Sequence, residues 1–244
     1  MYYGYYPSMY RGYGGYYDST MLLILAGLLI GLLASALVRS SMNKYAKIRN
    51  YRNITGAEAA ARLLQSEGLY DVQVRPLNSD SGDHYDPRTK TVNLSYSNYY
   101  EPSITSMAVA CHECGHAIQH AQGYAPLNFR SALVPAVNFA NKLSMPILLI
   151  GMLLGYNSFL MQLGILAFAL TVLFQLVTLP VEFDASHRAL IKMEQFGFVS
   201  SEEYTGCKKV LTAAAFTYVA AALSAILSLV RLILLTNGGS RRRR

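Results

Sequence analysis

The sequence predicts a mainly α-helical integral membrane protein, with about four membrane-embedded helices and a small α+β domain between them. Apolar runs occupy residues 21–38, 143–179 and 211–236. Charged residues make up only 14% of the 244 residues, against about 25% in soluble proteins. The polar segment 39–142 contains short helix and strand patterns instead. Together these observations favour membrane helices around one small folded domain.

Residues 21–38 are expected to form the first transmembrane helix, because a span needs about 20 mainly apolar residues. Residues 1–20 are rich in Tyr and Gly and contain a single Arg. A cleavable signal peptide would need a basic start and a short apolar run. We therefore expect an uncleaved helix preceded by a flexible or interfacial tail.

The segment 39–142 has the patterns of an α+β domain. Thr55 and Glu58 form a capping-box pattern for a helix that Gly68 ends. Residues 70–77 alternate like a strand, and residues 84–95 resemble a hairpin. A further helix is expected over 103–121.

The second half of the chain alternates between apolar and polar segments. Residues 143–179 are expected to form a membrane hairpin, broken near Gly155, whose first arm is short for a full span. Pro180 is expected to end the hairpin, and a polar segment follows over 180–210. A last membrane helix over 211–236 precedes a basic tail, 237–244.

The helix over 103–121 contains the motif CHECGH, residues 111–116. His112 and His116 are four residues apart, so they differ by only about 40° around a helix and can bind one metal ion. Glu113 stands where a carboxylate can take a proton from the water that the metal activates. Gly115 would allow another backbone to approach closely. Two ordinary helical histidines and a surface Glu are the alternative.

The same motif also contains a C-x-x-C pattern. On a regular helix Cys111 and Cys114 point roughly 150° away from the histidine pair, so both pairs cannot bind one metal. Redox-active pairs need a thiolate at a helix N-terminus. With Cys207 the chain has only three cysteines, too few for a disulfide framework. We expect a packed, reduced pair, and a structural or solvent-facing His120.

A catalytic zinc site needs three protein ligands and one open position. The candidates for the third ligand are His84, Glu182, Asp184 and His187. A hairpin over 143–179 returns the chain to the side of the membrane that holds His112, so Glu182 can reach the metal. Alternatively, Glu182 and Asp184 bind no metal and only stabilise the N-terminus of a helix, where the helix dipole favours acidic residues.

Three long motifs carry a family resemblance: GDHYDPRTKTVNLSYS, AVACHECGHAIQHAQGYAPL and FQLVTLPVEFDASHRAL. They resemble the YugP-type membrane neutral zinc metallopeptidases and, more distantly, the HtpX/Ste24-type membrane proteases. The resemblance covers residues 21–236 and implies a zincin-like domain with one Zn²⁺ per chain.

By this resemblance His112, His116 and Glu182 are the zinc ligands and Glu113 is the catalytic glutamate. The distant relatives have an Asp four residues after the ligand Glu, where this chain has Ser186, so the expectation that Asp184 supports a zinc histidine rests on proximity alone. His187 or Arg188 could stabilise an oxyanion. The strand 91–95 resembles the edge strand that binds extended peptides, or is an ordinary hairpin strand.

The expected function is a membrane-embedded zinc-dependent endopeptidase that cleaves membrane-associated or unfolded polypeptides. The alternative is a non-catalytic membrane protein with a structural or sensory zinc site, which would need a fourth ligand such as His120, His187 or Asp184. A metal-free scaffold would leave the cluster of His and Glu unexplained.

The net charge of +7 lies beside apolar runs, which indicates contact with the lipid bilayer and not with nucleic acid. Five Lys and Arg residues within 39–52, against one in the N-terminal tail, predict a multi-pass protein of the cell membrane with its active site on the cytoplasmic side. The C-terminal RRRR opposes this orientation, since four spans would place it outside. The sequence leaves homo-oligomerisation open.

Overall fold

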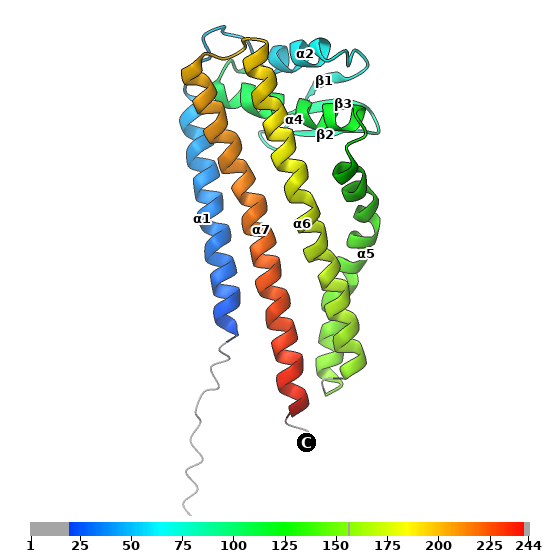
Figure 1. The fold of residues 1–244 in the computed structure, drawn as a ribbon. Coiled ribbons are helices and arrows are strands. Elements are labelled where there is room, and N and C mark those ends of the chain that lie inside the picture. The colour runs from blue at the N-terminus through cyan, green and yellow to red at the C-terminus, as the bar shows by residue number, and fades with distance from the viewer. Residues whose placement is uncertain (1–19, 156, 242–244) are drawn as a thin grey trace, which may run out of the picture.

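The computed structural model describes residues 20–155 and 157–241. Figure 1 shows the elements in chain order, with bounds α1 Met21–Ala46, α2 Gly56–Ser66, β1 Gln73–Pro76, β2 His84–Asp86, β3 Thr91–Leu94, α3 Tyr96–Tyr100, α4 Ile104–Ala121, α5 Ala125–Leu153, α6 Ser158–Gln195 and α7 Ser201–Arg241. The expectations for the Tyr-rich tail and for the end of the basic tail fall on residues 1–19 and 242–244, outside the described residues.

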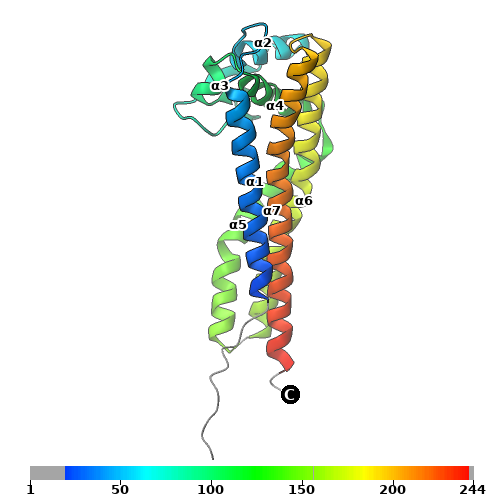
Figure 2. The same cartoon turned by 90° about the vertical axis from the view of Figure 1, so that its left-hand side faces the viewer.

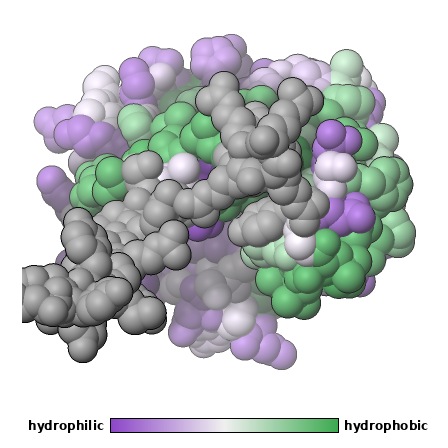
Figure 3. All heavy atoms as spheres, turned by 90° about the horizontal axis from the view of Figure 1, so that it is seen from below, coloured by the Kyte–Doolittle hydropathy of each residue, from purple (hydrophilic) through white to green (hydrophobic). Residues whose placement is uncertain are grey.

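Four long helices, α1, α5, α6 and α7, form an elongated bundle, and the small domain with the sheet lies at one end of it (Figures 1 and 2). Each of the four is long and apolar enough to cross a membrane. The outer face of α1 exposes leucines such as Leu22, which is 67% exposed. Seen from the end opposite the domain, apolar residues form much of the visible surface of the helices (Figure 3). Exposed side chains of this kind are suited to lipid.

The three strands form a mixed sheet in the order β1-β3-β2. β1 pairs parallel to β3, and β2 pairs antiparallel to it, which confirms the predicted hairpin. The strand 91–95 is therefore central and not an edge strand. Its side chains explain this position, because Val92 and Leu94 are fully buried and pack into the core beneath the sheet. The edge strand on the hairpin side is β2.

The capping box predicted for α2 is present. The Thr55 hydroxyl accepts from the Glu58 backbone N–H at 3.2 Å, and the Glu58 carboxylate accepts from the Thr55 N–H at 3.0 Å. The apolar face of α2 then packs against α4, with Leu63 and Leu64 in the core. This core fixes α4 beneath the sheet.

The long helices extend beyond the expected segments: α1 continues to Ala46 and α7 begins at Ser201, and the largest differences are in α5 and α6. α5 begins at Ala125, well before residue 143, and α6 continues through Pro180 to Gln195. Proline normally ends a helix because it lacks an N–H and its ring crowds the preceding turn. Here α6 packs along both α5 and α7, and packing against neighbouring helices makes proline tolerable in a membrane helix. Glu182 consequently lies in the middle of a helix, and the alternative that it only favours a helix N-terminus does not hold.

Candidate metal centre

Helix α4 presents the motif from a buried position. Ser103 caps its start, accepting from the Ser106 N–H at 3.0 Å. Most of the helix is buried, including Glu113 and His116, which are 7% and 9% exposed. The imidazole rings of His112 and His116 lie 4.8 Å apart between centroids. The four-residue spacing therefore brings both rings to one point, as predicted.

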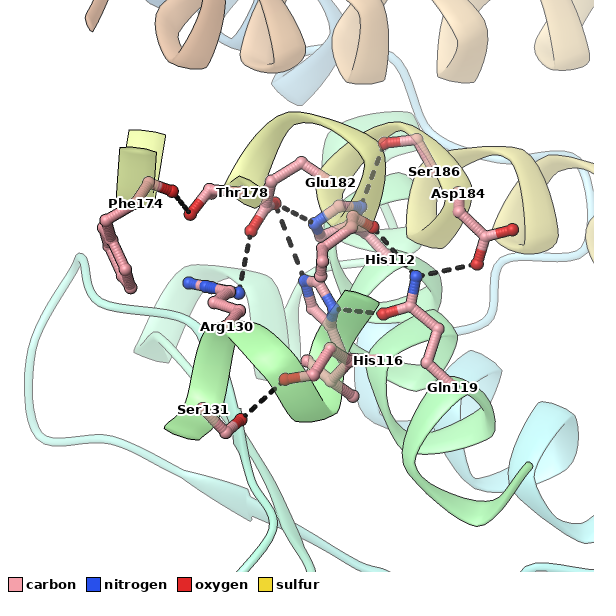
Figure 4. A network of polar contacts seen from close by, with 12 residues as sticks. His112, His116, Gln119, Arg130, Ser131, Phe174, Thr178, Glu182, Asp184 and Ser186 are labelled. Carbon is pink, nitrogen blue, oxygen red and sulfur yellow. Dashed lines mark hydrogen bonds and ion pairs between the residues drawn. The ribbon is translucent and has the colours of Figure 1, made fainter. Parts of the chain in front are cut away.

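Helix α6 brings Glu182 to the same point (Figure 4). The carboxylate oxygen Oε2 of Glu182 lies 3.3 Å from Nε2 of His112 and 3.6 Å from Nε2 of His116. Glu182 is only 3% exposed. One ligand atom from each of the three residues lies within 4.8 Å of the others, the one such group among the described residues.

The close approach of the two helices depends on Gly115. A Cβ at this position would lie 2.4 Å from the carbonyl oxygen of Ala185, far inside van der Waals contact. Only glycine lets the backbone of α4 rest directly against α6. The glycine inside the motif thus brings Glu182 within reach of the histidines.

Gln119 sets the orientation and the tautomer of His116. The fully buried Gln119 donates through Nε2 to the Val181 carbonyl at 2.8 Å and to the Asp184 carboxylate at 2.7 Å. Its Oε1 then faces Nδ1 of His116 at 3.0 Å and can only accept, so Nδ1 carries the proton. The lone pair of Nε2 is left to point toward Glu182 (Figure 4).

Ser186 supports the other histidine. Its hydroxyl lies 3.1 Å from Nδ1 of His112, on the side of the ring away from Glu182. Ser186 thereby takes the position at which the distant relatives have an acidic residue. Asp184 contacts neither histidine; it reaches His116 only through Gln119, and it is held by Arg188 in turn.

Arg130 of α5 pairs with the second oxygen of Glu182. Its Nη1 lies 3.2 Å from Oε1, so the two carboxylate oxygens have different partners, the guanidinium on one side and the histidines on the other. Burial alone would lower the pKa of His116, but the Glu182 and Glu113 carboxylates outweigh burial and raise it. The site therefore attracts positive charge.

A cavity of about 550 Å³ opens beside this cluster. Its walls come from the β2 region, α4, α5, α6 and α7, and include Tyr85, Glu113, Arg130, Glu182 and Tyr218. A second cavity, of about 140 Å³, lies against α1 and α7 and shares His112, Glu113, Glu182 and Tyr218 with the first. The carboxylate of Glu113 and the ligand cluster thus border space on two sides.

The residues present fit a zinc ion. Two imidazole nitrogens with free lone pairs and one carboxylate oxygen are a zinc ligand set, and three protein ligands beside a cavity leave a coordination position accessible. The hydrogen bonds to both Nδ1 atoms are of the kind that fixes zinc-bound histidines. Calcium and magnesium prefer oxygen ligands.

The other candidate residues lie away from this cluster. His84 and His187 are exposed. His120 pairs through Nδ1 with the Tyr85 hydroxyl at 2.9 Å and lines the larger cavity. Cys111 and Cys114 are fully buried in the core, and burial raises the pKa of both thiols. The cysteines are packing residues, as predicted.

The sequence reasoning missed Gln119, Arg130 and Tyr218 as parts of the site. The charge of Arg130 would have been a signal, since an ionisable residue in a membrane helix commonly marks a functional site, but the predicted membrane hairpin began only at residue 143. Gln119 and Tyr218 had no such signal, since neither carries a charge and their roles depend on contacts between helices.

Comparisons with known proteins identify the family of this chain. Residues 20–237 match the model of the family described as "Putative neutral zinc metallopeptidase". The chain is 45% identical over 217 residues to the "Putative membrane protease YugP" of Bacillus subtilis (strain 168), covering 89% of this chain and 96% of the relative. No solved structure matches it. With the family match spanning nearly the whole chain, this protein belongs to the neutral zinc metallopeptidase family of that description.

Proposed function

We propose that this protein is a membrane-embedded zinc-dependent endopeptidase that hydrolyses peptide bonds of membrane-associated or unfolded polypeptides. The observation that carries the proposal is the convergence of His112, His116 and Glu182 beside Glu113 in the wall of one cavity. Oε2 of Glu182 faces Nε2 of both histidines, and a cation bound between these three atoms would be stabilised by all of them.

His112, His116 and Glu182 would hold the zinc. When bound, zinc acts as a Lewis acid that polarises the substrate carbonyl and makes water a better nucleophile. Gln119 keeps His116 in the tautomer that offers Nε2, and Ser186 orients the ring of His112 through Nδ1. Arg130 holds Oε1 of Glu182, which leaves Oε2 for the ion.

Glu113 is the general base of this proposal. It follows His112 in the chain and borders the cavity on the same side as the ligands. It accepts a proton from the attacking water and gives a proton to the leaving amine.

The cavity wall offers a place for an extended chain. β2 is an edge strand of the sheet, and His84 and Tyr85 of this strand line the larger cavity. An extended peptide can pair with an exposed strand edge through its backbone. An unfolded segment meets this requirement more easily than a folded one does. We therefore assign to β2 the peptide-binding role that was first expected of the strand 91–95.

A structural or sensory zinc site is the weaker alternative. A closed site needs a fourth protein ligand. Of the candidates, His120 binds Tyr85, Asp184 binds Gln119 and Arg188, and His187 is exposed. The cluster has three members within residues 20–155 and 157–241.

The proposal is tested by zinc content. Wild type and the variants His112→Ala and Glu182→Ala are purified in detergent, and zinc per chain is measured beside cleavage of an unfolded protein. We expect about one zinc in the wild type, a strong loss in both variants, and loss of cleavage with the metal. Glu194→Ala, an exposed site on the same helix, is the control. Full zinc content in Glu182→Ala would remove Glu182 from the ligand set.

A further inference from the structure

The smaller cavity has a wall of different character from the larger one. Its lining includes the Ser186 hydroxyl of α6 beside the catalytic groups, and the rest of its wall is apolar and comes from three helices: Met42 of α1, Val109 of α4, and Val210, Leu211, Ala214 and Ala215 of α7. The larger cavity is bordered instead by polar groups such as Asp83, His84, Asn128 and Arg130.

The two cavities share the proposed catalytic groups in their walls. His112, Glu113, Glu182 and Tyr218 belong to the linings of both. A peptide bond placed beside Glu113 would therefore have the polar space with β2 on one side and the apolar space on the other. A side chain next to that bond can enter the smaller cavity while the backbone remains along β2.

The size of the smaller cavity suits one side chain. Its volume is about 140 Å³, and an apolar cavity of roughly 150 Å³ accepts a molecule of benzene. An aliphatic or phenyl side chain fits this space, whereas a charged side chain would lose its hydration without a partner. Ala214 and Ala215 keep the space open, since any larger residue there would fill it.

We propose that this cavity is the specificity pocket of the enzyme and binds an apolar side chain flanking the cleaved peptide bond, of Leu to Phe size. The inference rests on the proposed peptidase function. It restricts the substrates to apolar positions of polypeptides, such as those of membrane segments or of cores exposed by unfolding.

Reciprocal variants of the pocket wall test this inference. Ala215→Val narrows the cavity and Leu211→Ala widens it. Ala222→Val is the matched control, because Ala222 is also a buried alanine of α7 but lines neither cavity. Each protein digests the same unfolded protein, and the cleaved bonds are identified by mass spectrometry. Zinc per chain and melting temperature are measured in parallel.

We expect the wild type to cleave beside aliphatic and aromatic residues. Ala215→Val should lower the ratio of cleavage beside Phe to cleavage beside Ala by roughly 10-fold or more, and Leu211→Ala should raise this ratio. The reason is that one methylene in such a pocket changes discrimination between substrates by about 10–200-fold. Zinc content should stay at the wild-type level, and Ala222→Val should leave the preference unchanged.

Unchanged cleavage positions in both pocket variants, with zinc and overall cleavage retained, would overturn the pocket. The same conclusion follows if only the melting temperature moves, since the cavity is then a matter of packing alone. A wild type that binds zinc but cleaves no bond would overturn the peptidase function, and the pocket with it.

Discussion

At the scale of single residues, the candidate centre depends on side chains that never touch the ion. The amide nitrogen of Gln119 donates to two other partners, so the amide oxygen is the atom that faces His116. This oxygen can only accept, and it accepts from Nδ1 of His116. The Ser186 hydroxyl contacts Nδ1 of His112 and orients this second ring. Each imidazole is therefore oriented before a metal arrives, which reduces the cost of assembling the site.

Replacing Gln119 should weaken zinc binding. Gln119→Leu keeps the volume but frees His116 to rotate and to change tautomer, and loss of such a partner typically lowers metal affinity about 10–100-fold. Competition with a chelator of known affinity measures this change. Gln65→Leu, on the exposed face of α2, is the control. Equal zinc affinity in Gln119→Leu and the wild type would mean that the hydrogen bond to Nδ1 is not needed.

The ion pair between Arg130 and Glu182 predicts a stability effect that depends on the metal. Without zinc, Arg130→Met leaves a buried carboxylate short of positive charge. We expect the free energy of unfolding to fall by roughly 1–3 kcal/mol. This value lies between those for exposed and buried ion pairs, because Arg130 is partly exposed. When zinc is bound, the ion supplies positive charge beside Glu182, so Arg130→Met should lower the free energy of unfolding by less.

Thermal unfolding in detergent, with excess zinc and with chelator, measures both cases. Arg62→Met, an exposed arginine of α2, shows the effect of removing a surface charge. The same destabilisation of Arg130→Met in both conditions would contradict the account of Arg130 as the partner of Glu182.

At the scale of elements, the contact between α4 and α6 determines whether the centre exists. α4 carries the two histidines and the glutamate that we propose as ligands and general base, and α6 carries Glu182, the proposed third ligand, in the middle of a long helix. Their backbones touch at Gly115 and Ala185.

Gly115→Ala should therefore disrupt the centre. The added methyl group would meet the Ala185 carbonyl at 2.4 Å, so the helices must separate and carry Glu182 away from the histidines. We expect lower zinc content and a lower melting temperature. Gly31→Ala is the matched control, because a Cβ there meets nothing within 4 Å and alanine favours a helix by about 1 kcal/mol over glycine. Normal zinc content in Gly115→Ala would show that zinc binding does not require the close contact between α4 and α6 at Gly115.

The elements also show how far sequence reasoning reaches. The spacing of His112 and His116 predicted one shared ion because helix geometry is local, and the Thr55 cap was readable for the same reason. The partners of the imidazoles were not readable, since they depend on the register between α4 and α6. The continuation of α6 through Pro180 depends on packing against α5 and α7, which overrides the local preference of proline.

At the scale of the whole molecule, four apolar helices carry a polar domain at one end of the bundle (Figure 2). The α5–α6 turn lies at the other end (Figure 1). The basic residues that follow the apolar part of α1 lie on the side of the domain, so by the positive-inside rule we expect the candidate centre to face the cytoplasm.

Cysteine labelling tests this orientation. The three native cysteines are fully buried and should not react in the folded protein. Arg88→Cys, in the exposed hairpin turn, should be protected from a membrane-impermeant maleimide in intact cells and react after permeabilisation. Ser158→Cys, at the α5–α6 turn, should react in intact cells if the hairpin spans the membrane. The reverse pattern would place the centre outside the cell.

The measurement that tests the central claim most directly compares wild type with Glu113→Gln. Both proteins are purified alike, zinc per chain is determined, and cleavage of an unfolded protein is followed over time. We predict about one zinc per chain in both proteins and cleavage by the wild type alone, because glutamine cannot accept the proton. Equal cleavage by the two proteins, or zinc in both with cleavage by neither, would contradict a zinc peptidase that uses Glu113 as its base.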